Sequence, residues 1–152
     1  MKTIETETDR FGRARQLYKL GKSAEALAEL ERLGTGYQGD RDVLELRWAL
    51  YAGQDQWPTC VDIARRLTLQ RPDDAHGWLC LADSVRNVPG GTLQMSYDIL
   101  VSAARQIRDP ILLLTLGRYS AQLGRVEEMR EWIDKAHEEG DASILNGEIR
   151  IQ

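Results

Sequence analysis

The sequence has few cysteines and no long hydrophobic run. Only Cys60 and Cys80 occur among 152 residues, so no disulfide framework can hold the chain together. Both lie in apolar segments with helical spacing, and we expect two buried free thiols. No run approaches the roughly 18 apolar residues of a membrane-spanning helix. The first ten residues lack the apolar core and cleavage site of a secretory signal, so we expect a cytoplasmic protein without a membrane segment.

The chain also lacks a surplus of positive charge. Lysine and arginine total 20 against 24 aspartates and glutamates, which gives a formal net charge of −4 and a pI of about 5.3. Proteins that bind nucleic acid through its phosphates need a positive surface, so we expect no nucleic-acid partner. The length and the 42% of hydrophobic residues are typical of a single globular domain.

Signals for β-strands are nearly absent, and apolar residues recur with the spacing of amphipathic helices. Short turns containing glycine or proline separate these segments. The helices are expected at about 9–20, 24–33, 41–52, 58–70, 75–87, 93–107, 110–123 and 126–139. Gly140 is expected to end the last of them.

The turns inside successive helix pairs recur at a fixed interval. They fall at Gly21, Asp55, Pro89 and Gly124, which are 34, 34 and 35 residues apart. A fixed period near 34 with two helices per unit is typical of a helical solenoid, in which each hairpin buries its apolar face against the next.

The residues at these positions resemble the tetratricopeptide repeat (TPR) family, whose first helix follows the pattern W-x2-L-G-x2-Y. Trp78, Leu81, Ala82 and Val85 match it in the third unit. The fourth unit matches with Leu113, Leu116, Gly117 and Ser120. Two departures stand out: Arg10 and Arg13 occupy positions that are usually apolar, and Trp48 stands where a small residue is usual.

The resemblance implies an all-α fold, a right-handed α-solenoid of about eight helices. Its repeats would span about 7–40, 41–74, 75–109 and 110–140, after an N-terminal extension at 1–6. Residues 141–152 would form a C-terminal tail or capping segment. The apolar residues of this tail leave open whether it caps the last hairpin or contacts a second copy of the protein.

One short stretch raises the alternative of a metal or catalytic site. His76 and Cys80 are four residues apart and could share one face of a helix. A tetrahedral zinc site needs about four ligands, and Cys60 and His137 do not have ligand spacing to this pair. No set of nucleophile, base and acid can be assembled, so we expect no enzyme activity, no metal and no cofactor.

The resemblance also implies a function, because the first helices of TPR pairs line a concave groove that binds a peptide or partner helix. Its groove-facing positions combine apolar side chains with charges of both signs, which favours a protein partner with a hydrophobic anchor and mixed charges. They correspond here to Phe11, Arg15, Tyr18, Lys19, Asp42, Glu45, Ala49, His76, Leu79, Asp83, Arg86, Leu114 and Arg118. The main alternative is self-association into a homo-oligomer, and an enzyme or metal-binding protein is a further alternative.

Overall fold

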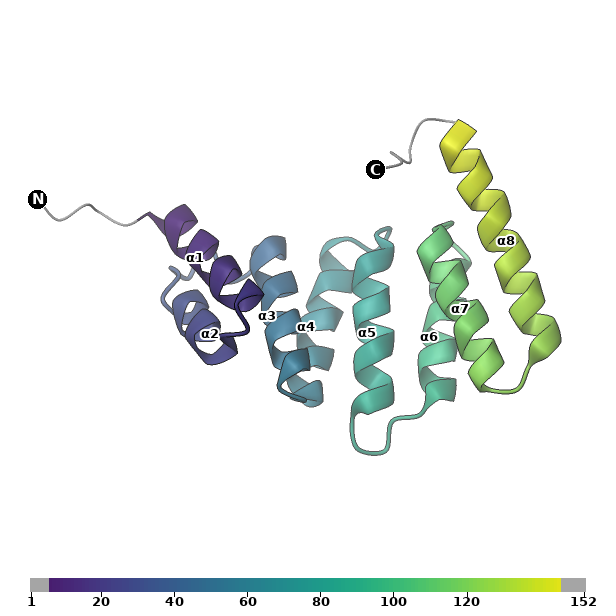
Figure 1. The fold of residues 1–152 in the computed structure, drawn as a ribbon, viewed down its shortest axis with the longest axis horizontal. Coiled ribbons are helices and arrows are strands. Elements are labelled where there is room, and N and C mark those ends of the chain that lie inside the picture. The colour runs from purple at the N-terminus through teal and green to yellow at the C-terminus, as the bar shows by residue number, and fades with distance from the viewer. Residues whose placement is uncertain (1–5, 146–152) are drawn as a thin grey trace, which may run out of the picture.

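The computed structural model describes residues 6–145, and these residues form eight α-helices arranged in a row (Figure 1). The helices are α1 (Glu7–Lys19), α2 (Ser23–Glu31), α3 (Arg41–Gly53), α4 (Trp57–Gln70), α5 (Ala75–Asn87), α6 (Leu93–Ala104), α7 (Pro110–Gln122) and α8 (Val126–Leu145). The expected all-α solenoid is therefore confirmed. Residues 1–5 of the expected N-terminal extension and residues 146–152 of the expected C-terminal tail lie outside the described part of the chain.

Side-chain caps define the starts of several helices. The Thr6 hydroxyl accepts a hydrogen bond from the backbone N–H of Asp9 at 3.1 Å, and the Asp9 carboxylate in turn accepts from the N–H of Thr6. Asp74 accepts from the N–H of His76 at 2.9 Å and so begins α5. These caps satisfy backbone donors that have no partner within the helix.

The turns inside the four hairpins share one backbone conformation. Gly21, Asp55, Gly90 and Gly124 have φ values of 74°, 56°, 79° and 76°. Glycine adopts this left-handed region freely, and aspartate is among the few other residues that tolerate it. The positions confirm the period near 34 residues, and the third turn is centred on Gly90, one residue after Pro89.

The last helix is longer than expected. We expected Gly140 to end it, and that expectation was wrong, because α8 continues through Gly140 to Leu145. A glycine inside a helix costs roughly 1 kcal/mol relative to alanine, and this penalty alone does not stop a helix that has no proline after it. Residues 141–145 of the expected tail are thus part of α8.

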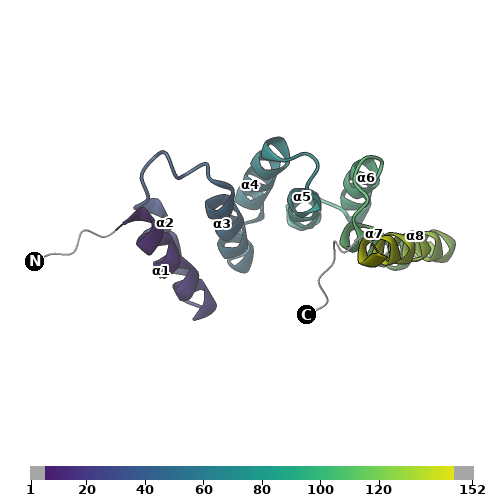
Figure 2. The same ribbon diagram turned by 90° about the horizontal axis from the view of Figure 1, so that it is seen from above.

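First and second helices of different hairpins lie on opposite sides of the row. In the view from above, α1, α3 and α7 lie along one side, and α4 and α6 lie along the other (Figure 2). The closest packing joins neighbouring helices, with the fewest contacts between α2 and α3 and between α6 and α7. The core is accordingly divided into clusters, each shared by adjacent hairpins, as a solenoid requires.

Small residues allow the paired helices to approach closely. Ala26 and Ala82 are fully buried, and Gly117 lies against Ile133 of α8. Trp78 is partly buried, and its indole nitrogen donates a hydrogen bond to the backbone oxygen of Pro72 at 2.9 Å. This bond links the start of α5 to the turn that precedes it. No helix in the described part of the chain combines the length and apolar character needed to cross a lipid bilayer.

Candidate partner-binding groove

Two adjoining pockets lie along the face formed by α1, α3, α5 and α7. The first has a volume of about 420 Å³ and opens between α1 and α3. Its lining residues are Phe11, Arg15, Tyr18, Lys19, Asp42, Glu45, Leu46, Trp48, Ala49 and His76. Eight of these are groove positions expected from the sequence, so side chains that are up to 65 residues apart meet in one pocket.

The second pocket continues along the same face toward α7. It has a volume of about 300 Å³, and its lining residues are Trp48, His76, Leu79, Cys80, Asp83, Thr115, Arg118 and Tyr119. Trp48 and His76 line both pockets, so the two hollows adjoin at these side chains. We call the two pockets together the groove.

The indole of Trp48 forms the floor between the pockets. Its Nε1 donates to the hydroxyl of Ser84 on α5 at 2.8 Å, and that hydroxyl donates to the backbone oxygen of Cys80 at 2.7 Å. The ring also packs against the core cluster formed by Val61, Ala64, Cys80 and Leu81 of α4 and α5. These contacts hold a large apolar surface in place at the centre of the groove.

Arg41 fixes the wall of the groove at the junction of α3, α4 and α5. Its guanidinium lies 3.0 Å from the carboxylate of Glu45 and 2.9 Å from that of Asp74, the cap of α5. It also donates to the backbone oxygen of Leu67 at 3.4 Å, near the end of α4. Since Arg41 is mostly buried, this bridge holds the negative charge of Glu45 close to a compensating cation.

Two arginines lie beside a buried tyrosine at the far end of the groove, and one of them, Arg118, lines the second pocket. The guanidinium carbons of Arg86 and Arg118 lie 5.5 Å and 6.0 Å from the centre of the Tyr119 ring, within range of cation–π attraction. Burial raises the pKa of the nearby Asp83 carboxyl above its ordinary value, and the two guanidinium groups only partly offset this. Burial likewise raises the pKa of Tyr119, so its phenol stays neutral.

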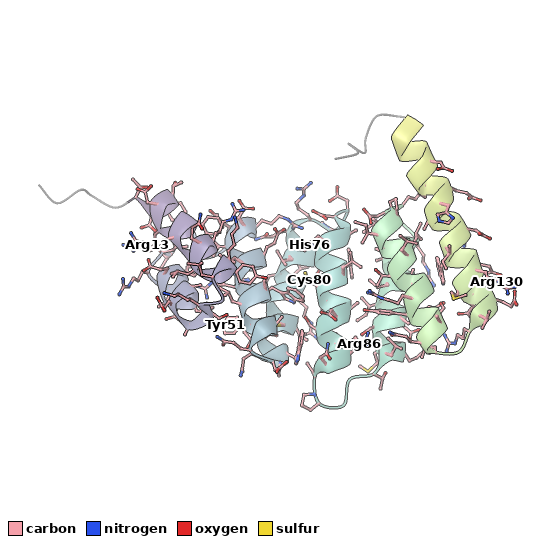
Figure 3. The ribbon with its side chains drawn as sticks, in the orientation of Figure 1. Arg13, Tyr51, His76, Cys80, Arg86 and Arg130 are labelled. Atoms are coloured by element: carbon pink, nitrogen blue, oxygen red, sulfur yellow. The ribbon has the colours of Figure 1, made fainter. Side chains whose placement is uncertain are left out.

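His76 and Cys80 do share a face of α5, as their spacing suggested (Figure 3). The Cys80 sulfur lies 3.6 Å from Nε2 of His76. Burial, with Glu45 and Asp83 nearby, raises the pKa of the Cys80 thiol to about 12, so the thiol is protonated at neutral pH and is a poor nucleophile. Within residues 6–142 no three histidine, cysteine, aspartate or glutamate side chains are grouped so that they could hold a metal. Cys60 and Cys80 are free and buried, as expected.

The remaining expected positions lie on the same helices but outside the two pockets. Leu114 of α7 is 45% exposed and lines neither pocket, and Arg86 reaches the groove through its contact with Tyr119. Figure 3 shows His76 near the start of α5 and Arg86 near its end. Five residues line the pockets without having been expected from the sequence as groove positions: Leu46, Trp48, Cys80, Thr115 and Tyr119. For one of them, Trp48, the sequence did carry a signal, because this large side chain occupies a position where the TPR pattern usually has a small residue.

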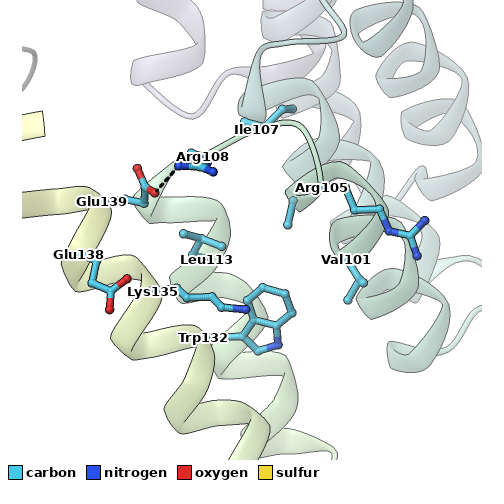
Figure 4. A pocket seen from close by; sticks show the side chains of 10 residues that line it. Val101, Arg105, Ile107, Arg108, Leu113, Trp132, Lys135, Glu138 and Glu139 are labelled. Atoms are coloured by element: carbon cyan, nitrogen blue, oxygen red, sulfur yellow. Dashed lines mark ion pairs between the residues drawn. The ribbon is translucent and has the colours of Figure 1, made fainter. Parts of the chain in front are cut away.

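A further cleft lies at the C-terminal end of the row, between α6, the loop after it, α7 and α8 (Figure 4). It has a volume of about 420 Å³ and includes Trp132, whose ring lies 4.7 Å from the Lys135 ammonium nitrogen. Arg108 and Glu139 form an ion pair at its edge, at 3.8 Å.

Comparison with solved structures identifies the fold. The chain is similar to TTC0263, described as a thermophilic TPR protein in Thermus thermophilus, with a TM-score of 0.69 and 20% identity over 90% of this chain and 75% of that one. The chain has a TPR fold. It is also similar to a MamA RS-1 double mutant, with a TM-score of 0.71 and 12% identity over 93% of this chain and 79% of the other.

A second MamA structure, "MamA MSR-1 C2", has a TM-score of 0.66 and 15% identity, and the match covers 94% of this chain and 82% of that one. No protein-family model and no curated protein matches the sequence. The TPR resemblance expected from the residue pattern is therefore confirmed by structure alone. At these identities the likeness establishes the arrangement of the helices and leaves the function to the chemistry of the groove.

Proposed function

We propose that this TPR solenoid is a protein-interaction scaffold that binds a peptide or a short helix of a partner protein along the groove. The observation that carries the proposal is that two pockets on the same face adjoin at Trp48 and His76, which line both of them. Together the pockets offer an apolar floor with charged side chains at its edges. That combination suits a segment with an apolar anchor and polar flanks.

The chemistry of the groove favours binding over catalysis. The thiol of Cys80 is neutral and nearly inaccessible, and His76 has no carboxylate hydrogen-bonded to its ring among the described residues. Glu45 is instead held in an ion pair with Arg41, and Arg86 and Arg118 lie against the Tyr119 ring in cation–π contacts, which position these side chains. The free thiols are consistent with a role in a reducing compartment such as the cytoplasm.

A substitution that fills the first pocket tests the proposal. Ala49→Arg places a long charged side chain in that pocket, while Ala28→Arg adds the same side chain on the exposed surface of α2. A display library of random peptides is selected on the wild-type protein, and the selected peptides are measured by fluorescence anisotropy. We expect Ala49→Arg to weaken them more than about tenfold and Ala28→Arg to leave them unchanged.

Two results would contradict the proposal, provided that circular dichroism shows both variants folded. One is that the library yields no peptide that binds the wild-type protein. The other is that Ala49→Arg binds the selected peptides as well as Ala28→Arg does. Light scattering on the same variants addresses self-association: a wild-type dimer that Ala49→Arg converts to a monomer would assign the groove to a second copy of the chain.

A further inference from the structure

The cleft at the C-terminal end of the row has an apolar floor that is partly open to solvent. Val101 of α6 lies across from Trp132 of α8, and both side chains are only partly buried (Figure 4). Ile107 and Leu113 complete the floor and are buried. Covering the exposed parts of Val101 and Trp132 with a further apolar side chain would remove apolar surface from water, which is favourable.

The edges of this cleft carry charges of both signs that are incompletely paired. Among the described residues, Arg105 on α6 and Glu138 on α8 each have no oppositely charged group within 4 Å. Arg108 and Glu139 form a pair at 3.8 Å, and the Arg108 side chain is 82% exposed. The cleft therefore suits a short segment that has an apolar face and one charge of each sign.

The sequence that follows α8 has this character. Residues 146–152, which lie outside the described part of the chain, read NGEIRIQ. Ile149 and Ile151 alternate with Glu148 and Arg150, which is the spacing of an extended strand with one apolar face. Asparagine and glycine readily adopt the left-handed backbone with which many helices end. The pair at 146–147 therefore favours a turn that sends the strand back along α8.

The length of this segment matches its distance from the cleft. A strand advances about 3.3 Å per residue, so residues 148–152 reach about 16 Å from the turn. An α-helix rises about 1.5 Å per residue, so the same distance leads from Leu145 back along α8 by about eleven residues. That range contains Lys135, Glu138 and Glu139, which line the cleft. A strand that runs back beside α8 therefore overlaps the part of the helix that faces the cleft.

We propose that residues 148–152 fold back beside α8 and occupy this cleft, with Ile149 and Ile151 toward its apolar floor. Glu148 and Arg150 then lie at its edges, within reach of the oppositely charged side chains there. The segment links α6 to α8 at a place where few contacts join the third hairpin to the fourth. It also closes the cleft to other partners, and it does so independently of what the groove binds.

Paramagnetic broadening measured on the full chain tests this placement. A nitroxide is attached to Gln152→Cys, because the two native cysteines are buried, and the four tryptophan indole N–H signals are recorded by NMR. Each signal is assigned with a tryptophan-to-phenylalanine variant. We expect most of the Trp132 signal to be lost and the Trp48 signal of α3 to be unchanged. A nitroxide on the exposed Ala28→Cys of α2 should leave the Trp132 signal intact.

Substitutions within the segment separate docking from the proximity that the covalent link alone produces. In the protein labelled at Gln152→Cys, Ile149→Asp/Ile151→Asp puts two charges on the apolar face, and most of the lost Trp132 signal should return. The matched control is Ile149→Leu/Ile151→Leu, which keeps the face apolar and should keep the broadening.

Three outcomes would overturn the inference. One is a Trp132 signal that is equally strong with and without the nitroxide on Gln152→Cys. Another is equal broadening in the aspartate and leucine versions, which would assign the effect to the covalent link. The third comes from mixing isotope-labelled protein that lacks the nitroxide with unlabelled protein that carries it: equal broadening in this mixture would assign the segment to a second copy of the chain. The altered residues do not line the groove, so none of these outcomes bears on the proposed function.

Discussion

The indole nitrogen of Trp48 lies 2.8 Å from the hydroxyl of Ser84, and this hydrogen bond joins α3 to α5 across the boundary between two hairpins. Ser84 is fully buried, while Trp48 is partly exposed at the floor of the groove. A single side chain thus contributes to the core and to the surface that we propose binds a partner. Stability and binding are coupled at this position, and substitutions there should affect both.

We predict that Trp48→Phe lowers the free energy of unfolding by about 1–2 kcal/mol, because it removes the hydrogen bond and part of the packed ring. Ser84→Ala should cost about 1 kcal/mol, and the double variant should cost less than the sum of the two. Urea denaturation of the four proteins measures this coupling. Trp57→Phe is the control, because no hydrogen bond of the Trp57 indole occurs in the described part of the chain. Strict additivity of Trp48→Phe and Ser84→Ala would contradict the prediction.

Trp78 provides a second test of how the hairpins are held together. Trp78→Ala should lower the free energy of unfolding by about 3 kcal/mol, since it removes a packed ring and the bond to the Pro72 oxygen. That is a large part of the roughly 5–15 kcal/mol that stabilises a typical domain. Leu69→Ala, at a side chain that is 80% exposed, should change the stability by less than about 0.5 kcal/mol. Equal melting temperatures for the two variants would contradict the packing described for Trp78.

The period of the turns made most of the fold predictable. Gly21 and Gly124 mark turns that need a left-handed backbone, and glycine is visible in the sequence as such a signal. Once the period fixes how the helices pair, only one face of each helix can pack into the core. The positions on the opposite face of that helix can then be assigned as well. This is why eight expected groove residues meet in the first pocket. The end of α8 was missed because a glycine penalty is small and nothing nearby adds to it.

The parts of the groove that the sequence did not predict depend on the direction of individual side chains. A repeat pattern assigns the position of Trp48 to a small packing residue, and only the structure shows the ring reaching α5. Tyr119 was not predicted as a groove residue, because its ring is buried with the core. The same ring nevertheless contacts Arg86 and Arg118 at the groove. Long-range electrostatic contacts of this kind leave no periodic signal in the sequence.

Two glycines within helices should respond oppositely to alanine. A Cβ atom at Gly117 would lie 3.1 Å from Cγ1 of Ile133, so Gly117→Ala should force α7 and α8 apart and cost about 1–3 kcal/mol. Gly12 of α1 has nothing within 4 Å of that position, and Gly12→Ala should stabilise the protein by about 0.5–1 kcal/mol. Thermal denaturation checks both signs. Adding Ile133→Ala to Gly117→Ala should cost less than the two single changes together; full additivity would count against this contact.

The buried thiol of Cys80 should make the protein sensitive to alkaline pH. Its pKa is raised from the ordinary value of 9.0 to about 12, chiefly by burial. Below pH 9 the thiol is protonated in both states, so its contribution to stability is fully present. As the pH rises from 9 toward 12, the unfolded chain loses this proton and the folded chain keeps it, and the contribution is lost.

The slope of this loss is at most about 1.4 kcal/mol per pH unit for one group. We therefore expect wild-type protein to lose more stability than Cys80→Ala when urea denaturation under reducing conditions is repeated from neutral pH into the alkaline range. The pKa of Cys60 is raised to about 11, so Cys60→Ala should reduce the alkaline loss by a smaller amount. If wild type and Cys80→Ala lose the same free energy over this range, the thiol is not protected by burial as the structure requires.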